Sequence, residues 1–185
     1  MHVDLFHEKI IVLFLFIQTI ATSAQRYSVV VSEIMADPVP SAGLPEYEWI
    51  ELYNRGSSWV NLAGWRIGDA SGQSGPMPAY ELQPGSAVLV AGSTAASHLS
   101  ALANCLPVTS WPSLDNNGDL IVLYDNSGEV IHALQYENAW FSNPAKKEGG
   151  WTLEMQHEAY PCLGRENWKE SNVNGGGSPE RLLRI

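Results

Sequence analysis

The sequence predicts an all-β domain, both from one strand pattern and from the composition. From Glu48 to Asn54 the side chains alternate, with Ile50 and Leu52 on one face and polar or aromatic neighbours on the other, which is the two-residue period of a β-strand. The 185 residues include 16 Gly, 11 Pro and 7 Trp, which favours many short strands joined by tight turns. With 45% hydrophobic and 16% charged residues, we expect one globular domain with one core.

Apolar and β-branched runs predict the other strands. We expect strands at residues 28–34, 48–54, 65–67, 79–82, 86–91, 120–124, 129–136 and 151–155. Ser93 and Thr94 can cap a short helix that extends through Asn104 and crosses between sheets. Three prolines between Met35 and Glu46 exclude a central strand there. Residues 162–172 have no strand period, and we expect Trp168 to hold them against the strands.

The N-terminus has the features of a secretory signal peptide. Residues 10–17 are an unbroken apolar run, and the small residues Thr22, Ser23 and Ala24 supply a cleavage site. The run is too short to span a membrane. We therefore expect residues 1–24 to be removed and the protein to be exported, to an extracellular, cell-surface or periplasmic location. A domain would then occupy residues 25–179, with a short tail at 180–185.

Several stretches carry a family resemblance. They are Glu-Ile-Met-Ala-Asp-Pro at 33–38, Glu-Trp-Ile-Glu-Leu-Tyr-Asn at 48–54, Asn-Leu-Ala-Gly-Trp-Arg-Ile at 61–67, Asn-Gly-Asp-Leu-Ile-Val-Leu-Tyr-Asp at 117–125, Gly-Gly-Trp-Thr-Leu-Glu at 149–154, Asn-Trp at 167–168 and Gly-Gly-Ser-Pro at 176–179. Together they resemble the lamin tail domain, in the version found in exported bacterial proteins. The resemblance covers residues 29–179 and implies an immunoglobulin-like β-sandwich with one short crossover helix.

The resemblance also bears on function. Bacterial relatives are accessory modules of larger exported proteins, some beside hydrolase or nuclease domains and others beside adhesive ones, and the family supplies no catalytic residues. The sequence departs from the family after Pro179, where Glu-Arg-Leu-Leu-Arg-Ile follows. A solitary module and a truncated piece of a larger surface protein are the two interpretations of this ending.

The charge argues against two classes of partner. The formal net charge is −10 and the sequence pI is about 4.8, whereas a sequence-independent grip on nucleic acid or anionic lipid needs clustered Lys and Arg. Lys146 and Lys147 form the only adjacent basic pair. We therefore predict no nucleic-acid partner and no membrane span.

The acidic residues Glu33, Asp37, Glu48 and Glu51 are candidate metal ligands. If the first two strands lie side by side, these carboxylates could converge on Ca²⁺, which prefers oxygen ligands. The commoner explanation is a set of surface acids, with Glu51 paired to Arg66 on a neighbouring strand. We expect no other cofactor.

Two pairs of residues complete the candidate features. Trp59 and Trp140 sit at the edges of turns, where an indole can stack on a sugar ring or a protein partner. Cys105 and Cys162 are the only cysteines, and an exported protein with two cysteines is expected to form a disulfide between them.

No stretch has the spacing of a catalytic motif. Ser74 lacks the Gly-x-Ser-x-Gly pattern of a nucleophile elbow, and Gly175 to Pro179 neither follows a strand nor opens a helix, as a phosphate-binding loop would. The sequence therefore predicts a non-catalytic exported module for protein or cell-surface interaction. A carbohydrate- or calcium-binding sandwich is the alternative, and a hydrolase-associated domain is a lesser one.

Overall fold

A computed structural model describes residues 26–180. The predicted signal peptide at residues 1–24 lies outside this range. The larger sheet has six strands in the order β11-β10-β1-β2-β6-β7. Their bounds are Val29–Met35 (β1), Trp49–Asn54 (β2), Ala87–Gly92 (β6), Cys105–Val108 (β7), Leu153–Met155 (β10) and Trp168–Glu170 (β11).

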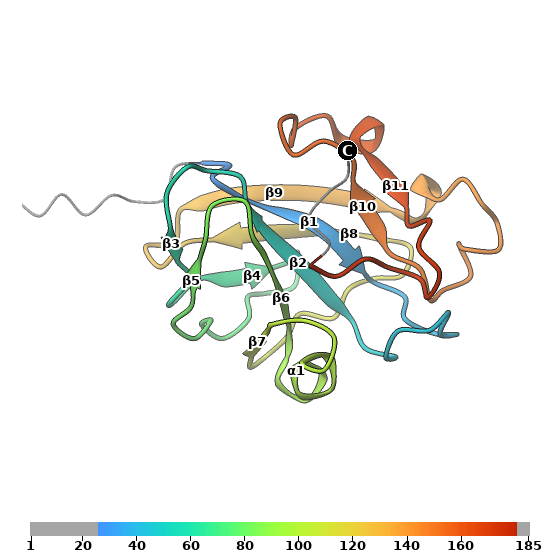
Figure 1. Ribbon diagram of the computed structural model, residues 1–185, viewed down its shortest axis with the longest axis horizontal. Helices are drawn as coiled ribbons and strands as arrows, with labels where there is room; N and C mark the ends of the chain where they lie inside the picture. The colour runs from blue at the N-terminus through green and yellow to red at the C-terminus, as the bar shows by residue number, and fades with distance from the viewer. Residues whose placement is uncertain (1–25, 181–185) are drawn as a thin grey trace, which may run out of the picture.

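A second sheet of three strands, in the order β4-β8-β9, faces the first (Figure 1). It consists of Arg66–Gly68 (β4), Gly118–Tyr124 (β8) and Val130–Glu137 (β9). A two-stranded ribbon, Val60–Asn61 (β3) with Glu81–Leu82 (β5), lies at one end. Short 3₁₀ helices occur at Asn138–Trp140 (η1) and Gly164–Asn167 (η2). The all-β sandwich that the sequence predicted is confirmed.

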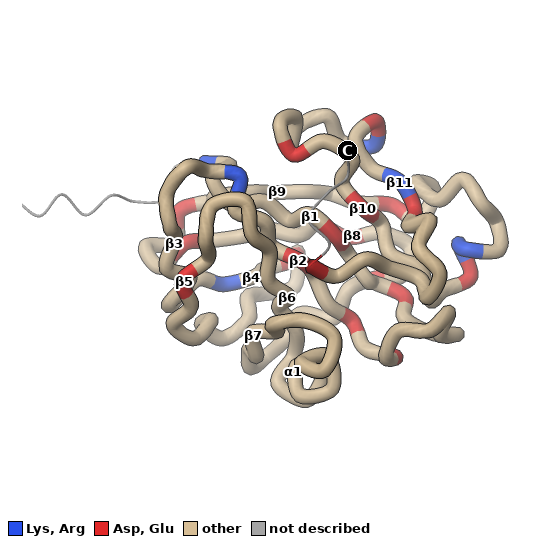
Figure 2. The backbone as a smooth tube through the Cα atoms, in the orientation of Figure 1, with Lys and Arg blue, Asp and Glu red and all other residues tan. Residues whose placement is uncertain are grey.

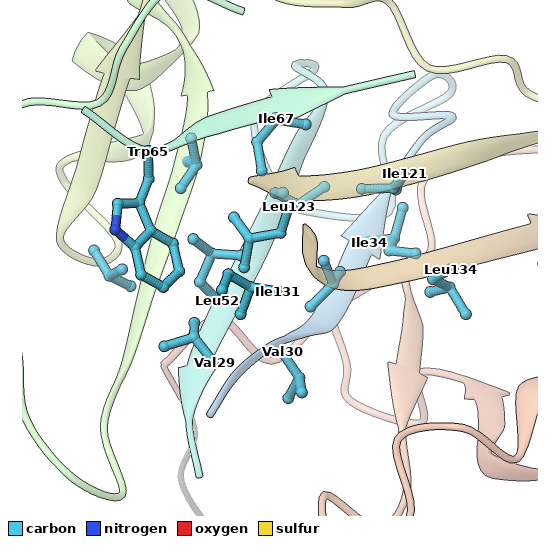
Figure 3. Packing of buried hydrophobic residues seen from close by; sticks show 14 of the residues in the cluster. Val29, Val30, Ile34, Leu52, Trp65, Ile67, Ile121, Leu123, Ile131 and Leu134 are labelled. Atoms are coloured by element: carbon cyan, nitrogen blue, oxygen red, sulfur yellow. The ribbon is translucent and has the colours of Figure 1, made fainter. Parts of the chain in front are cut away.

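The main core fills the space between the two sheets. Figure 3 shows Val29 and Leu52 of the larger sheet pointing toward Leu123 and Ile131 of the smaller one, with Trp65 closing one side. All of these side chains are buried. The predicted alternation along β2 is therefore correct for the face that carries Ile50 and Leu52.

A second apolar cluster covers the opposite face of the larger sheet. Met35, Trp49 and Leu89 pack there against the helix Ser93–Leu99 (α1). Because both faces of the sheet are covered, five of the six residues of β2 are buried, more than a half-buried strand would show. The helix is also shorter than predicted, and its N-cap residue is Gly92 rather than a serine or threonine.

The helix joins two strands of one sheet. It leads from β6 to β7, which pair in parallel, whereas we expected it to cross between sheets. Strand β7 forms one edge of the larger sheet and contains Pro107, which has no N–H to offer to a further strand. This edge is therefore protected against pairing with another chain.

The C-terminal strap, residues 175–180, crosses the same face of the larger sheet as α1, the face that carries Glu33 and Glu51 and is turned away from the smaller sheet. The Thr152 N–H donates to the Gly176 carbonyl at 2.7 Å, and the Asn104 N–H donates to Glu180 Oε1 at 2.8 Å. Glu180, which we had assigned to the tail, thus contacts the sandwich. Within residues 26–180, no helix is long and apolar enough to cross a membrane.

Candidate functional site

An open cleft lies at one end of the sandwich. Pro38 and three segments line it: residues 46–48 just before β2, residues 92–95 where β6 passes into α1, and residues 108–111 from the end of β7 onward. Its volume is about 640 Å³, inside the range of roughly 300–1,000 Å³ of ligand pockets. These segments are far apart in the sequence and meet because β2, β6 and β7 are neighbours in one sheet.

Trp111 is fixed in the cleft wall by Glu48. The indole Nε1–H donates to Glu48 Oε2 at 2.9 Å, and the same oxygen accepts the Leu114 N–H at 3.0 Å. The ring also packs over Gly92, where a Cβ would come within 3.2 Å of the Trp111 Cβ. Fixing an aromatic ring before a ligand arrives lowers the entropy cost of binding.

Tyr47 forms a second aromatic element of the cleft. Its ring stacks on His98 of α1, with centroids 4.9 Å apart and an interplanar angle of 13°. The stack ties the loop before β2 to the helix, so two walls of the cleft are held at a set separation.

The lining of the cleft is acidic. It contains the carboxylates of Glu46 and Glu48 and no Lys or Arg. The chain has no Lys or Arg between Arg26 and Arg55, or between Arg66 and Lys146, and these two intervals supply every lining residue. Figure 2 accordingly shows no basic segment on α1 or β7. The cleft therefore attracts cations and repels anions.

Comparison with known families decides what kind of domain carries this cleft. Residues 22–138 match the family model described as Lamin Tail Domain, which covers more than half of the chain. The chain belongs to the lamin tail domain family. Lamin tail domains are non-enzymatic, immunoglobulin-like interaction modules. No curated protein matches this chain.

The two tryptophans predicted at the surface of this lamin tail domain differ in burial. Trp59 is 58% exposed, as expected for a residue that can touch a partner. Trp140 is only 8% exposed and packs against Trp168, with ring centroids 6.1 Å apart, so its assignment as a surface-binding residue was wrong. Trp140 lies in η1, which packs against the sandwich. Its position at the edge of a turn in the sequence does not indicate that it is buried.

The candidate calcium ligands are not gathered into a metal site. Among the described residues, no group of three or more His, Cys, Asp or Glu side chains could hold a metal ion. Glu48 binds the Trp111 region, Asp37 lies in the loop after β1, and Glu33 and Glu51 lie opposite each other on β1 and β2. Arg66 is on the smaller sheet, where it donates to the Ser74 carbonyl at 2.7 Å.

Glu33 and Glu51 belong instead to a carboxylate row beneath the strap. Glu154, Glu33 and Glu51 are in register across β10, β1 and β2 and are all buried. The Ser178 N–H donates to Glu33 Oε1 at 2.7 Å, and the Glu180 N–H donates to Glu51 Oε2 at 2.6 Å. Burial, and then the charges of Glu51 and Glu154, raise the pKa of Glu33 to about 8. The row therefore anchors the strap.

The predicted Cys105–Cys162 disulfide is absent, because both thiols are free. Cys105 on β7 is separated from β1 by β6 and β2, which at about 4.8 Å per strand places it roughly 14 Å from β1. Cys162 lies beside the Tyr27 hydroxyl, just before β1. A disulfide needs Cα atoms within about 7 Å. The sequence shows that there are two cysteines, but it does not show that other strands of the sheet separate them.

The sequence analysis did not single out Trp111 or Tyr47. The unbroken absence of Lys and Arg from residue 67 to residue 145 was the available signal that one end of the domain is acidic. The positions that meet at that end could be found only with the strand order.

Proposed function

We propose that this lamin tail domain is a non-catalytic, exported interaction module that binds a protein of the cell surface through the cleft. The observation that carries the proposal is the preformed cleft, with its indole held by Glu48 and with no Lys or Arg in its lining. Loops at one end of a rigid sandwich are a common place for recognition. The domain would act alone or as an accessory part of a larger surface protein.

Export is supported by the apolar run at residues 10–17 and the small residues that follow it. The acidic charge suits a protein that avoids nucleic acid and anionic lipid. Hydrolytic turnover by the purified chain that is abolished by one Asp or Glu substitution would overturn the non-catalytic assignment.

Site-specific photo-crosslinking tests the cleft. A photo-reactive amino acid at Thr94, an exposed lining residue, should yield protein adducts in the cell envelope of the source organism. The same group at the exposed Glu129, which does not line the cleft, is the control. Trp111→Ala should remove the Thr94 adducts. Equal adducts from both positions, or none from Thr94, would contradict the proposal.

Carbohydrate binding through Trp59 is the second candidate. The observation that favours it is the 58% exposure of this indole, since a free aromatic face can stack on a sugar ring. Glycan-array binding that is lost in Trp59→Ala and kept in Trp111→Ala would support this function over the cleft.

A further inference from the structure

We propose that the cleft binds an extended segment of the partner protein that carries lysine or arginine side chains. This inference rests on the proposed function and names the chemistry of the partner. The charge of the cleft, its aromatic wall and its open, hydroxyl-bearing lining support it.

The charge of the lining selects for a cation. Glu46 is exposed at the mouth of the cleft, and Glu48 lies deeper, where it accepts hydrogen bonds only from neutral donors: the Trp111 indole, the Ser113 hydroxyl and the Leu114 N–H. These bonds stabilise a carboxylate without neutralising its charge. A bound ammonium or guanidinium would complete the charge balance, whereas a carboxylate or phosphate would be repelled.

The indole of Trp111 suits the same ligand. A Lys or Arg head group over the face of a tryptophan gains a cation–π interaction. The domain already contains such a pair, because Lys146 Nζ lies 4.2 Å from the centroid of the Trp151 ring. In the cleft the carboxylates and the indole are present, and the lining itself supplies no cation.

The openness and the polar lining of the cleft suit an extended chain. The cleft is open to solvent, and its lining includes the hydroxyl-bearing residues Ser93, Thr94, Thr109 and Ser110. Hydroxyls can donate to or accept from a peptide backbone. A volume of about 640 Å³ has room for a few residues of extended peptide.

Titration of the full chain with three probes tests the inference. The probes are a nonapeptide of alternating Lys and Gly, its Glu and Gly counterpart, and chitotetraose, followed by calorimetry and tryptophan fluorescence. We expect binding of the lysine peptide alone, weakened as the salt concentration rises from about 0.05 to 0.5 M.

Two isosteric variants distinguish the effect of charge within the cleft from the effect of the net charge of the protein. Glu46→Gln should weaken binding of the lysine peptide by roughly 5- to 10-fold, as expected for the loss of one nearby charge. Glu129→Gln makes the same change of net charge at an exposed residue outside the lining. It should change the affinity for the lysine peptide by less than about 2-fold. Trp111→Phe, which keeps a weaker aromatic face, should weaken binding and reduce the fluorescence response.

Three outcomes would overturn the inference. Equal weakening by Glu46→Gln and Glu129→Gln would mean general attraction to an acidic protein. Binding of chitotetraose or of the glutamate peptide in place of the lysine peptide would assign the cleft to another ligand. Thr94 adducts from the envelope without binding of the lysine peptide would reject the partner chemistry and leave the proposed function in place.

Discussion

The His132 side chain accepts a backbone hydrogen bond next to a β-bulge in a central strand. The register between β1 and β2 shifts between Val31 and Glu33, a β-bulge at Ser32. The Val31 N–H donates instead to Nδ1 of His132 on β9, at 3.0 Å. Because this nitrogen accepts a hydrogen bond, His132 is neutral in the folded domain. Burial lowers its pKa from 6.5 to about 4.

The lowered pKa of His132 predicts a loss of stability in acid. The unfolded chain takes up the proton near pH 6.5 and the folded domain only near pH 4, so this contribution is complete above pH 6.5 and is lost as the pH falls towards 4. His132→Gln keeps an acceptor for Val31 and does not titrate. Between about pH 7.5 and 4.5, wild type should lose about 2–3 kcal/mol of unfolding free energy relative to this variant in urea titrations.

His157→Gln, a change at an exposed histidine, is the control. Its unfolding free energy should change with pH as that of wild type does. The comparison uses differences between variants because Glu33 acts in the opposite sense: its raised pKa gives stability that is complete below pH 4.5 and is lost as the pH rises towards 8. Parallel curves for His132→Gln and wild type would show that His132 is not buried in its neutral form.

The different burial of two tryptophans predicts unequal effects of the same substitution. Trp140→Ala removes a buried ring from the main core and should cost about 3–5 kcal/mol of unfolding free energy. Trp59→Ala changes an exposed ring and should stay within about 0.5 kcal/mol of wild type. Urea unfolding of both variants measures the difference, and similar losses would contradict the placement of Trp140.

At the scale of elements, two adjacent glycines test how closely the strap fits. Gly175 and Gly176 have φ values of +105° and +100°, so alanine is strained at both. A Cβ at Gly176 would lie 2.0 Å from the Gly150 carbonyl oxygen, whereas nothing lies within 4 Å of a Cβ at Gly175. Gly176→Ala should therefore lower the unfolding free energy by about 1–3 kcal/mol more than Gly175→Ala.

Urea unfolding gives the comparison, and hydrogen exchange at Ser178 and Glu180 locates the effect. Both N–H groups should lose protection in Gly176→Ala, because they donate to Glu33 and Glu51 only while the strap is docked. Equal costs for the two alanine variants would mean that the strap is not held against Gly150.

The strands of six or more residues were predictable from the sequence, whereas among the shorter ones β4, β5 and β10 were predicted and β3, β7 and β11 were missed. Strands β1, β2, β8 and β9 lie within a residue or two of their expected bounds, because six to eight residues display the period of a strand. Strand β7 was missed because it has only four residues and includes Pro107, a residue that argues against a strand. Strand β11 falls in a segment expected to lack strands, although Trp168 is buried as predicted.

The candidate site was less predictable than the fold. Of the residues chosen from the sequence, Trp59 is exposed as expected, and Glu48 is part of the cleft in another role than calcium binding. Trp111 acquires its role only because β7 places it beside Gly92 and Glu48. Contacts of this kind depend on strand order, which local pattern does not encode.

At the scale of the whole molecule, the distribution of charge predicts the absence of DNA binding. Residues 26–180 contain seven Lys or Arg residues against 18 Asp or Glu residues, and no stretch gathers more than two adjacent cations. The full chain should give no mobility shift with duplex DNA at roughly micromolar protein and about 150 mM salt. Submicromolar binding under these conditions would reject this prediction.

The pairing of β1 with β10 has a consequence for the timing of folding. Glu33 on β1 pairs with Glu154 on β10. The ribosome therefore synthesises β1 about 120 residues before β10. At a synthesis rate of roughly 5–20 residues per second, this delay is of the order of 10 s. During it, the larger sheet lacks β10 and β11. The same delay leaves one side of β1 open to chaperones until the last quarter of the chain arrives.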